Sequence, residues 1–441
     1  MKILVAGAGH GGLVAAGWLA KAGADVTVIE RNPEQNLGYD WEDVFNLACL
    51  PEAGIAMPDP EECHVACSMT FCSPSRNYGI DAYIPPEQCT ESLTARRAVL
   101  RNLIAFAREN GVAFQFETCV QRPLIEGSRI IGLAVQGAGG PQELGADLVI
   151  DAAGIDSPVR TQLPESFGIE REFRRDQYFT TYRMGYNHTG KAPLKGPFSI
   201  YLFPLGKPGI GWVSMESEDR IDFMVGTFED PDPDFAEQVR QSLRERHPEL
   251  GDTVTREGRA GKIPVRRAIS RMVADGYAAI GDCAAMTVPV IGQGIYNSIL
   301  AGQLLAQTVL SPANKNCTAA ELWPYQVEYM RRIGAVHASL DIVKDFLLKL
   351  NPEKVDFLFK NRILTDEDLI SGRTGEEFKI TPEQLIARKI LRFENIPMLV
   401  RMSGMLATSN ALKARAQKIP AQYSEKAARA WAEKYNNTRF G

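Results

Sequence analysis

The stretch KILVAGAGHGGLVAAGWLAKAGADVTVIE at residues 2–30 decides the fold of the N-terminal part of the chain. The apolar run at 2–6 predicts a strand, and a glycine-rich turn follows it. The segment at 13–23 has small residues on one face and predicts a helix, and DVTVIE at 25–30 predicts a second strand. Together these segments form a βαβ unit.

The turn of this unit carries a dinucleotide-binding pattern. Gly7, Gly9 and Gly12 form G-x-G-x-x-G, in which two glycines let a pyrophosphate approach the backbone and the third lets helix and strand pack closely. The helix N-terminus supplies N–H groups, and Glu30 at the end of the second strand can accept ribose hydroxyls. We therefore predict a bound dinucleotide, with Arg31 as a further contact.

A second glycine cluster occurs far along the chain, in GDCAAMTVPVIGQGIYNS at 281–298. Its acid follows an apolar strand and could accept hydrogen bonds from ribityl hydroxyls, and its later glycines open a predicted helix whose N–H groups could face a flavin. Because FAD is extended and needs its two ends fixed separately, two such distant loops favour FAD over NAD. The residues predicted to bind FAD here are Gly281, Asp282, Pro289, Gly292, Gln293, Gly294 and Ile295.

The composition excludes several classes of protein. The 441 residues are 45% hydrophobic and 23% charged, which allows a large core and more than one domain. The net charge of −5 argues against a nucleic-acid partner, and no apolar run reaches the roughly 20 residues of a spanning helix, so we expect a cytoplasmic protein. The tail from Ala411 to Gly441 is basic and could touch an anionic membrane or an acidic redox partner, although a solvated helix face is the simpler interpretation.

The eight cysteines do not form a regular framework. Cys63, Cys67, Cys72 and Cys89 lie close in sequence, but their spacings match no standard ligand pattern, so we expect packed thiols and no metal. The histidines also lack ligand spacing, and His10 occupies a variable position of the glycine loop.

Three motifs in order resemble a known family. The first glycine loop with Glu30, DLVIDAAGIDSPVR at 147–160, and GKIPVRRAISRMVADGYAAIGDCAAMTVPVIGQGI at 261–295 are similar to the FAD-dependent superfamily of the aromatic-hydroxylase (p-hydroxybenzoate hydroxylase) fold. Within it, the chain most resembles the geranylgeranyl reductase branch. The resemblance covers roughly residues 1–310 and implies FAD as cofactor. It also implies that Arg97 approaches the cofactor, with Arg96 as the alternative.

The resemblance also implies the domain organisation. We expect an α/β fold with a discontinuous Rossmann-type FAD-binding domain, an inserted antiparallel β-sheet substrate domain and a C-terminal helical region. Helical periodicity at 92–110 and at 381–391, where Thr381 is the expected N-cap, fits this plan. The predicted ranges are 1–75, 92–165 and 263–318 for the FAD-binding domain, 76–91 and 166–262 for the substrate domain, and 319–441 for the helical region.

Two positions depart from the hydroxylases of this fold. Ala153 stands where NADPH-using hydroxylases carry an aspartate, and Ala285 stands where they usually carry a histidine. Alanine cannot accept a hydrogen bond through its side chain or carry charge. Both departures favour the reductase branch.

The substrate side is predicted from FSIYLFPLGKPGIGWV at 198–213, which resembles the aromatic-rich strand of the reductase branch although its spacer is shorter. Tyr201, Phe203 and Trp212 could form the wall of a hydrophobic pocket, or could simply be core residues. Tyr201 and Cys49 are the candidate proton donors. YDWEDVF at 39–45 could position a substrate near the cofactor, or be a surface loop.

The resemblance implies reduction of carbon–carbon double bonds in a prenyl or lipid-like chain by hydride from reduced flavin. The alternatives are an aromatic monooxygenase and an electron-transfer flavoprotein that links a protein donor to a quinone. No second dinucleotide motif opens a helix, so electrons would come from transiently bound NAD(P)H or from a reduced ferredoxin or flavodoxin.

Overall fold

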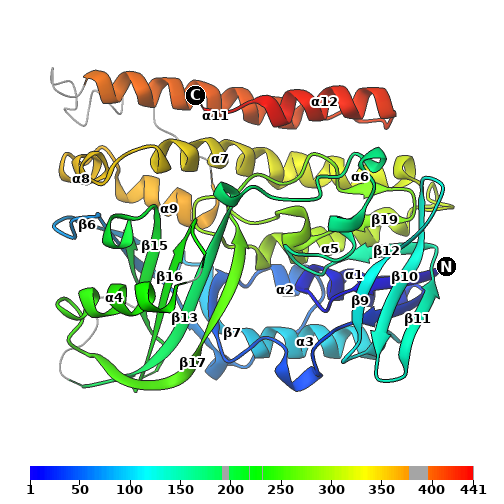
Figure 1. Ribbon diagram of the computed structural model, residues 1–441, viewed down its shortest axis with the longest axis horizontal. Helices are drawn as coiled ribbons and strands as arrows, with labels where there is room; N and C mark the ends of the chain where they lie inside the picture. Colours follow the sequence, from blue (N-terminus) through cyan, green and yellow to red (C-terminus); the bar gives the residue numbers. More distant parts are fainter. Residues whose placement is uncertain (191–197, 218, 231, 377–395, 441) are drawn as a thin grey trace.

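The structure is a computed structural model that describes residues 1–190, 198–217, 219–230, 232–376 and 396–440. Figure 1 shows a parallel sheet with helices at one end, a large antiparallel sheet at the other, and long helices stacked above both. The predicted α/β fold with a Rossmann-type domain is confirmed. The predicted helix at 381–391 lies outside the described residues.

The N-terminal βαβ unit belongs to a six-stranded sheet. Val5 lies opposite Val28 on one side and Ile150 on the other, and all three side chains are 0% exposed. Such apolar strands are typical of a parallel sheet that is covered on both faces. In spatial order the strands are β18 (Val273–Ala274), β19 (Tyr277–Ala279), β12 (Leu148–Asp151), β1 (Lys2–Ala6), β2 (Asp25–Ile29) and β8 (Ala113–Gln115).

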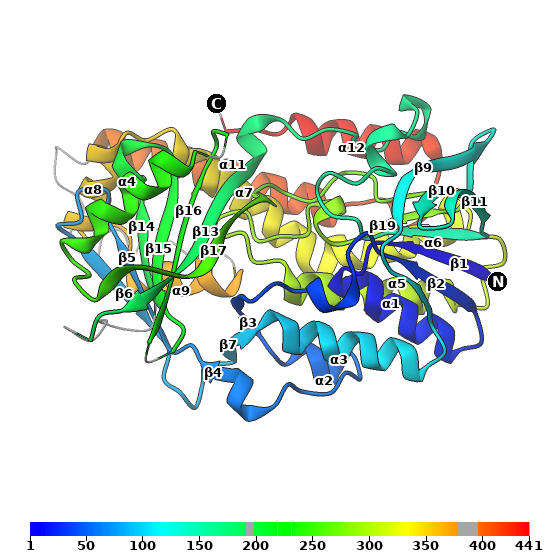
Figure 2. The ribbon, with the colours of Figure 1, turned by 60° about the horizontal axis from the view of Figure 1, so that its bottom comes forward.

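Helices and a small meander surround this sheet. Helix α1 packs between α3 and α5 (Figure 2), and the antiparallel meander β9–β10–β11 lies beside β12. The bounds of these elements are α1 (His10–Lys21), α3 (Arg96–Glu109), α5 (Ile295–Val309), β9 (Cys119–Glu126), β10 (Arg129–Gly137) and β11 (Gly140–Gly145).

The large sheet has seven strands that pair antiparallel except for one parallel pair, and α4 (Pro233–Arg244) covers one of its faces. Asp232 caps this helix by accepting hydrogen bonds from the backbone N–H groups of Asp234 and Phe235. In spatial order the strands are β17 (Leu250–Pro264), β13 (Tyr178–His188), β16 (Arg220–Thr227), β15 (Gly209–Met215), β14 (Phe198–Leu202), β5 (Ser68–Cys72) and β6 (Gly79–Tyr83).

A three-stranded sheet connects the two large ones. It consists of β3 (Glu42–Asn46), β7 (Glu91–Ala95) and β4 (Cys63–Val65), and α2 (Cys49–Glu52) follows β3.

The strands correct two sequence-based boundaries. The helix expected over 92–110 begins only at Arg96, because the residues before it form β7 between β3 and β4. Strand β5 lies within the range 1–75 predicted for the FAD-binding domain, yet it pairs with β14 of the antiparallel sheet. The chain therefore enters that sheet before residue 76. The domain division itself stays a prediction.

The C-terminal part is helical, as expected from residue 319 onward. Helix α11 packs against α7, and α12 continues the outer layer in Figure 1. Trp323 of α6 donates a hydrogen bond to the carbonyl of Pro420, which ties this layer to the FAD-binding side. The bounds are α6 (Ala319–Tyr329), α7 (Ala335–Leu348), α8 (Pro352–Lys360), α9 (Asp366–Thr374), α11 (Ile396–Gln417) and α12 (Glu425–Asn437).

Candidate functional site

The first glycine loop and the predicted acid are in direct contact. Gly7 has the left-handed φ of +87° that its turn requires, and its N–H donates to the carbonyl of Ile29 at 2.7 Å. The N–H of Ala8 donates to Oε2 of Glu30 at 3.0 Å, while Asn32 donates to Oε1 through both its backbone and its side chain. The loop between β1 and α1 and the end of β2 therefore form one surface, as the motif predicts.

The second glycine cluster lies against the first. A Cβ atom on Gly11 would lie 2.3 Å from the carbonyl oxygen of Ser298, and a Cβ atom on Gly302 would lie 2.3 Å from the carbonyl oxygen of Gly11. Helices α1 and α5 thus cross at backbone contact, which only glycine permits at these positions. This crossing brings together two loops that are far apart in sequence.

The N-terminus of α5 faces the half-buried carboxylate of Asp282. Gly294 is the N-cap without a side-chain capping bond, and a Cβ atom there would lie 3.4 Å from Oδ1 of Asp282. Burial raises the pKa of Asp282 to about 6, and the nearby charge of Arg96 opposes this shift. A Cβ atom on Gly292 would lie 2.9 Å from Ile263, so the loop also abuts the antiparallel sheet.

The first loop also holds a polar atom that lacks a protein partner. His10 opens α1, and its Nε2 is buried without a hydrogen bond within the described residues. Burial, then the charge of Arg96, lowers the pKa of His10 to about 4, so the ring is neutral. Gly9, the N-cap of α1, has no side-chain capping bond either. Two uncapped helix N-termini and an orphaned donor or acceptor fit an anionic, hydroxyl-rich dinucleotide.

The two candidate arginines differ in their surroundings. Arg97 is exposed, whereas Arg96 is half-buried and donates to both carboxylate oxygens of Asp43, at 2.5 and 2.8 Å. Its charge acts on His10 and Asp282, the acceptors of the two loops. Arg96, the first residue of α3, therefore lies beside the two loops, and the arginine that contacts the cofactor stays a prediction.

The remaining predicted cofactor contacts lie along the same two loops. Arg31 follows β2 and is exposed, and Pro289 is buried beneath the second loop. Gln293 donates to Oε1 of Glu91 at 3.4 Å, and Ile295 is the first residue of α5. Gly281 has a left-handed φ of +68°.

The middle motif is organised by a residue that the sequence did not single out. Asp151 is 0% exposed and accepts hydrogen bonds from Ser157 at 2.6 Å, from Tyr277 at 2.9 Å and from the backbone N–H of Arg160 at 3.2 Å. The N–H of Ala153 donates to its other oxygen. The loop after β12 thus keeps its shape without a polar side chain at position 153.

The predicted aromatic wall is divided between the two faces of the antiparallel sheet. Ile200 pairs with Trp212 and Tyr201 pairs with Gly211, so Tyr201 and Trp212 point to opposite faces. Tyr201 lies in the apolar cluster beneath α4, whereas Trp212 and Phe203 pack with the main core. We call the first face the α4 face and the second the loop face, since it also carries Ile263, which Gly292 abuts.

The two candidate proton donors are buried. The hydroxyl of Tyr201 forms a 2.5 Å hydrogen bond with Nε2 of His247, whose Nδ1 contacts Glu249 at 2.9 Å. Burial raises the pKa of Tyr201. The Cys49 thiol donates to the carbonyl of Asn46, and burial raises its pKa to about 12. The Tyr201 hydroxyl is thus committed to the α4 face, away from the glycine loops.

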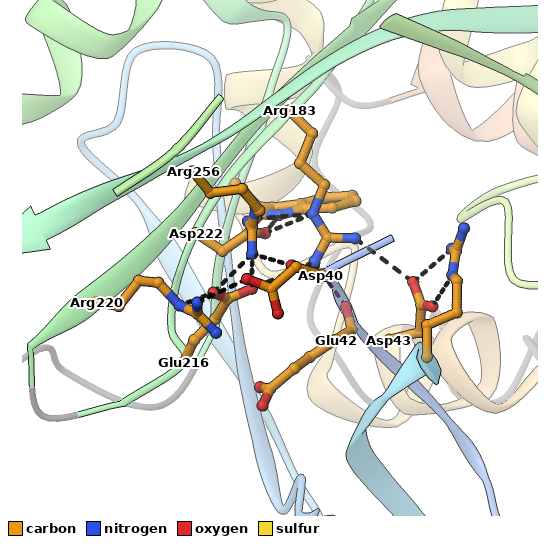
Figure 3. Close-up of polar contacts among 10 residues, drawn as sticks. Asp40, Glu42, Asp43, Arg183, Glu216, Arg220, Asp222 and Arg256 are labelled. Atoms are coloured by element: carbon orange, nitrogen blue, oxygen red, sulfur yellow. Dashed lines mark hydrogen bonds and ion pairs between the residues drawn. The ribbon is translucent and has the colours of Figure 1, made fainter. Parts of the chain in front are cut away.

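The loop face instead carries a cluster of ionised side chains that the sequence analysis missed (Figure 3). Arg183, whose side chain is 7% exposed, donates to Asp222 at 2.8 Å and to the backbone carbonyl of Glu42 at 2.6 Å. Trp212 donates to the same Asp222 at 2.7 Å. The signal was Asp222, a charged residue beside the apolar run of β16. The pairs of this ion cluster are Arg96–Asp43, Arg183–Asp222, Arg220–Asp40, Arg220–Glu216, Arg256–Glu216 and Arg256–Asp222.

The cysteines show no sign of a metal centre. All eight are free thiols, including Cys63 on β4 and Cys72 on β5. Within the described ranges, no group of three His, Cys, Asp or Glu side chains is arranged to hold a metal ion. In the same ranges, every helix is too short or too polar to cross a membrane.

The parallel sheet, the two crossed glycine loops and the inserted antiparallel sheet define an FAD-dependent oxidoreductase of Rossmann type. The chain belongs to the FAD binding domain family, whose sequence profile matches residues 1–333. The family resemblance predicted from the three motifs is thereby confirmed.

Several proteins are similar to this chain over most of its length. The digeranylgeranylglycerophospholipid reductase of Sulfolobus acidocaldarius is 22% identical, over 93% of this chain and 91% of its own length. The geranylgeranyl bacteriochlorophyll reductase-like protein of Thermoplasma acidophilum has the same fold, with a TM-score of 0.73, 18% identity, and coverage of 90% of this chain and 97% of its own. A probable FAD-dependent monooxygenase of Pseudomonas aeruginosa has a TM-score of 0.60 at 19% identity, and covers 82% of this chain and 99% of its own.

Proposed function

We propose that this protein is an FAD-dependent reductase that saturates carbon–carbon double bonds in a prenyl or other lipid-like chain. The observation that carries this proposal is the end-to-end similarity to a digeranylgeranylglycerophospholipid reductase, which spans 93% of this chain. Ala153 and Ala285 agree with it, because neither offers the polar side chain found in the hydroxylases of this fold.

The residues of the two loops would hold the cofactor. The glycine loop at 7–12 and the N-terminus of α1 would bind the pyrophosphate, Glu30 the ribose and Asp282 the ribityl hydroxyls. FAD, when bound, supplies hydride from its reduced ring. The N-terminal N–H groups of α5 would stabilise negative charge beside them.

The loop face would hold the substrate against the cofactor. Phe203 and Trp212 present apolar surface there, in the same core cluster as Ile200. Tyr201 is not included, because it packs on the α4 face. The electrons would come from NAD(P)H bound transiently or from a reduced ferredoxin or flavodoxin.

The basic tail supports contact with an anionic lipid surface, from which a lipid-like substrate would come. Helices α11 and α12 border a groove of about 480 Å³ lined by Trp431 and by Arg415, Lys418 and Lys434. Each lysine near such a surface contributes about 1 kcal/mol. Replacing Lys418 and Lys434 by glutamate should therefore reduce sedimentation with phosphatidylserine vesicles and leave that with neutral vesicles unchanged.

Anaerobic turnover tests the proposed activity. The purified yellow protein would be reduced with dithionite and given a geranylgeranyl lipid, and mass spectrometry should show two added hydrogens per reduced bond. Consumption of NADPH and oxygen with a small phenol would support a monooxygenase instead. Fast flavin oxidation by a quinone, with no alkene reduced, would support an electron-transfer flavoprotein.

A cofactor variant links this activity to the site. Asp282→Ala should release FAD on gel filtration, measured as loss of flavin absorbance, because it removes the carboxylate beside α5. Asp25→Ala, at an exposed position at the start of β2, is the matched control and should retain FAD. Full retention of FAD by Asp282→Ala would contradict the assigned role.

A further inference from the structure

The ion cluster contains one carboxyl group that differs from the others. Asp40, Asp43, Glu216 and Asp222 each contact an arginine side chain. Glu42 forms no such ion pair within the described residues, and its Oε2 is buried without a hydrogen-bond partner. Figure 3 shows its side chain pointing away from the arginines.

The side chain of Glu42 points away from that of its neighbour in the chain, Asp43. Successive side chains of a strand point to opposite faces, so Glu42 and Asp43 on β3 face opposite ways. Asp43 binds Arg96, whose charge reaches His10 and Asp282 on the cofactor loops. Arg183 of the loop face contacts Asp43 at 3.5 Å and donates to the backbone carbonyl of Glu42 at 2.6 Å. This end of β3 therefore lies against the loop face, and the Glu42 side chain is the one that does not contact Arg96.

The surroundings of Glu42 favour its neutral form. Burial is the main cause that raises its pKa to about 7, and the charges of Glu216 and Asp222 act in the same direction. Arg220 and Arg183 oppose this shift, but both are already bound to other carboxylates. The charged groups around it are Arg183 on β13, Glu216 beyond β15, Arg220 and Asp222 on β16, Arg256 on β17, and Asp40 and Asp43 on its own segment, with the Cys63 thiol on β4.

We propose that Glu42 is the catalytic acid that gives the substrate its proton. This inference rests on the proposed function, since saturation of a double bond needs one proton for each hydride. The hydride and its two electrons come from the reduced flavin and form a C–H bond at one alkene carbon. The O–H bond of the Glu42 carboxylic acid breaks, and its proton forms the C–H bond at the other carbon. Water then returns a proton to the Glu42 carboxylate.

The ion cluster would let Glu42 lose and regain its proton in each turnover while the other charges stay fixed. A fixed set of paired charges cannot easily reorganise, so the unpaired carboxyl is the group whose protonation changes at lowest cost. Neither of the predicted donors has this property. The Cys49 thiol holds its proton up to a pKa of about 12, and Tyr201 lies on the other face of the sheet.

The first test is spectroscopic and needs no substrate. Infrared difference spectra of the FAD-loaded protein, between acid and alkaline pH, should contain the C=O band of a protonated carboxyl that disappears as the pH rises through about 7. Asp282, whose pKa burial raises to about 6, contributes a second band in both proteins. The band that disappears near pH 7 should be missing from Glu42→Gln, which keeps the shape of the side chain, and present in Glu61→Gln, an exposed control. A Glu42→Gln spectrum that changes with pH as the wild-type spectrum does would overturn the proposal.

The second test is kinetic. Glu42→Gln should retain FAD and reduce the rate of alkene saturation by about 10²–10⁴-fold, the usual contribution of a general acid. The wild-type rate should fall as the pH rises through about 7, and the variant should lack this dependence. A wild type that saturates alkenes, with a Glu42→Gln variant of equal rate and pH profile, would overturn this inference alone. A wild type that saturates no alkene would overturn the proposed function as well.

Discussion

The two faces of the seven-stranded sheet bury different kinds of side chain. The α4 face carries Val213, Phe223 and Val225 in an apolar cluster. The loop face carries Arg183 and Asp222 from the same central strands. The residues named on both faces are buried, so the difference between them lies in chemistry rather than in burial.

The difference indicates that the two faces have separate roles. Burying apolar area stabilises the fold by roughly 25 cal/mol per Å², so the stability of the fold is enough to explain the apolar side chains of the α4 face. Buried ion pairs repay their desolvation cost only in part, and well-packed apolar residues would often serve stability equally well. A charged face beside the cofactor loops therefore indicates positioning and proton chemistry.

The largest expected effect comes from breaking the loop face. Arg183→Met should lower the free energy of unfolding by about 3–5 kcal/mol, because it removes one of the two arginines that contact the buried carboxylate of Asp222. Urea titration of the FAD-loaded protein, followed by circular dichroism, measures this loss. Arg122→Met is the control, since its pair with Glu143 is 52% and 65% exposed and contributes at most about 1 kcal/mol. Equal losses in both variants would remove the distinction between the loop face and an ordinary surface.

A smaller change in stability should distinguish Tyr201 from Trp212, which the sequence analysis assigned to the same pocket wall. Tyr201→Phe should cost about 1–3 kcal/mol of stability, because it leaves Nε2 of His247 buried and unpaired, and should leave the turnover number unchanged. Trp212→Phe removes a comparable hydrogen bond, to Asp222, and should lower turnover as well. A Tyr201→Phe protein with native stability and little activity would restore Tyr201 as a catalytic residue.

The motifs predicted the place of the first glycine loop in the fold because its determinants are local in sequence. Gly7, Gly9, Gly12 and Glu30 lie within one βαβ unit, where spacing along the chain fixes position in space. The pairing of the two loops was also predictable, because one extended cofactor requires both. The contact that brings them together, Gly11 against Gly302, was not singled out, since nothing in a single helix shows which partner it will meet.

The substrate half was predicted less well because it depends on register. A shift of one residue exchanges the faces of a strand, so the spacing of Tyr201 and Trp212 cannot show that they point apart until their strands are paired. The ion cluster combines side chains from β3, α3, β13, β16 and β17, which no short motif joins. The same limit applies to Arg96 and Arg97. They are adjacent at the start of α3, and the sequence does not show which of the two side chains lies beside the loops.

The last expected effect is a change in how stability depends on pH. The pKa of Glu42 is raised in the folded protein from its ordinary 4.5 to about 7, so this group contributes stability that is fully present below the lower value and is lost as the pH rises through the higher one. Between about pH 5 and pH 8, the free energy of unfolding should therefore fall more steeply in the wild type than in Glu42→Gln. Asp282 contributes a loss of the same sign, but it is present in both proteins and cancels in the comparison. Parallel pH profiles of the two proteins in urea titrations would mean that Glu42 is ionised over this whole pH range. The loop face would then contain no carboxylic acid at Glu42 that could donate a proton.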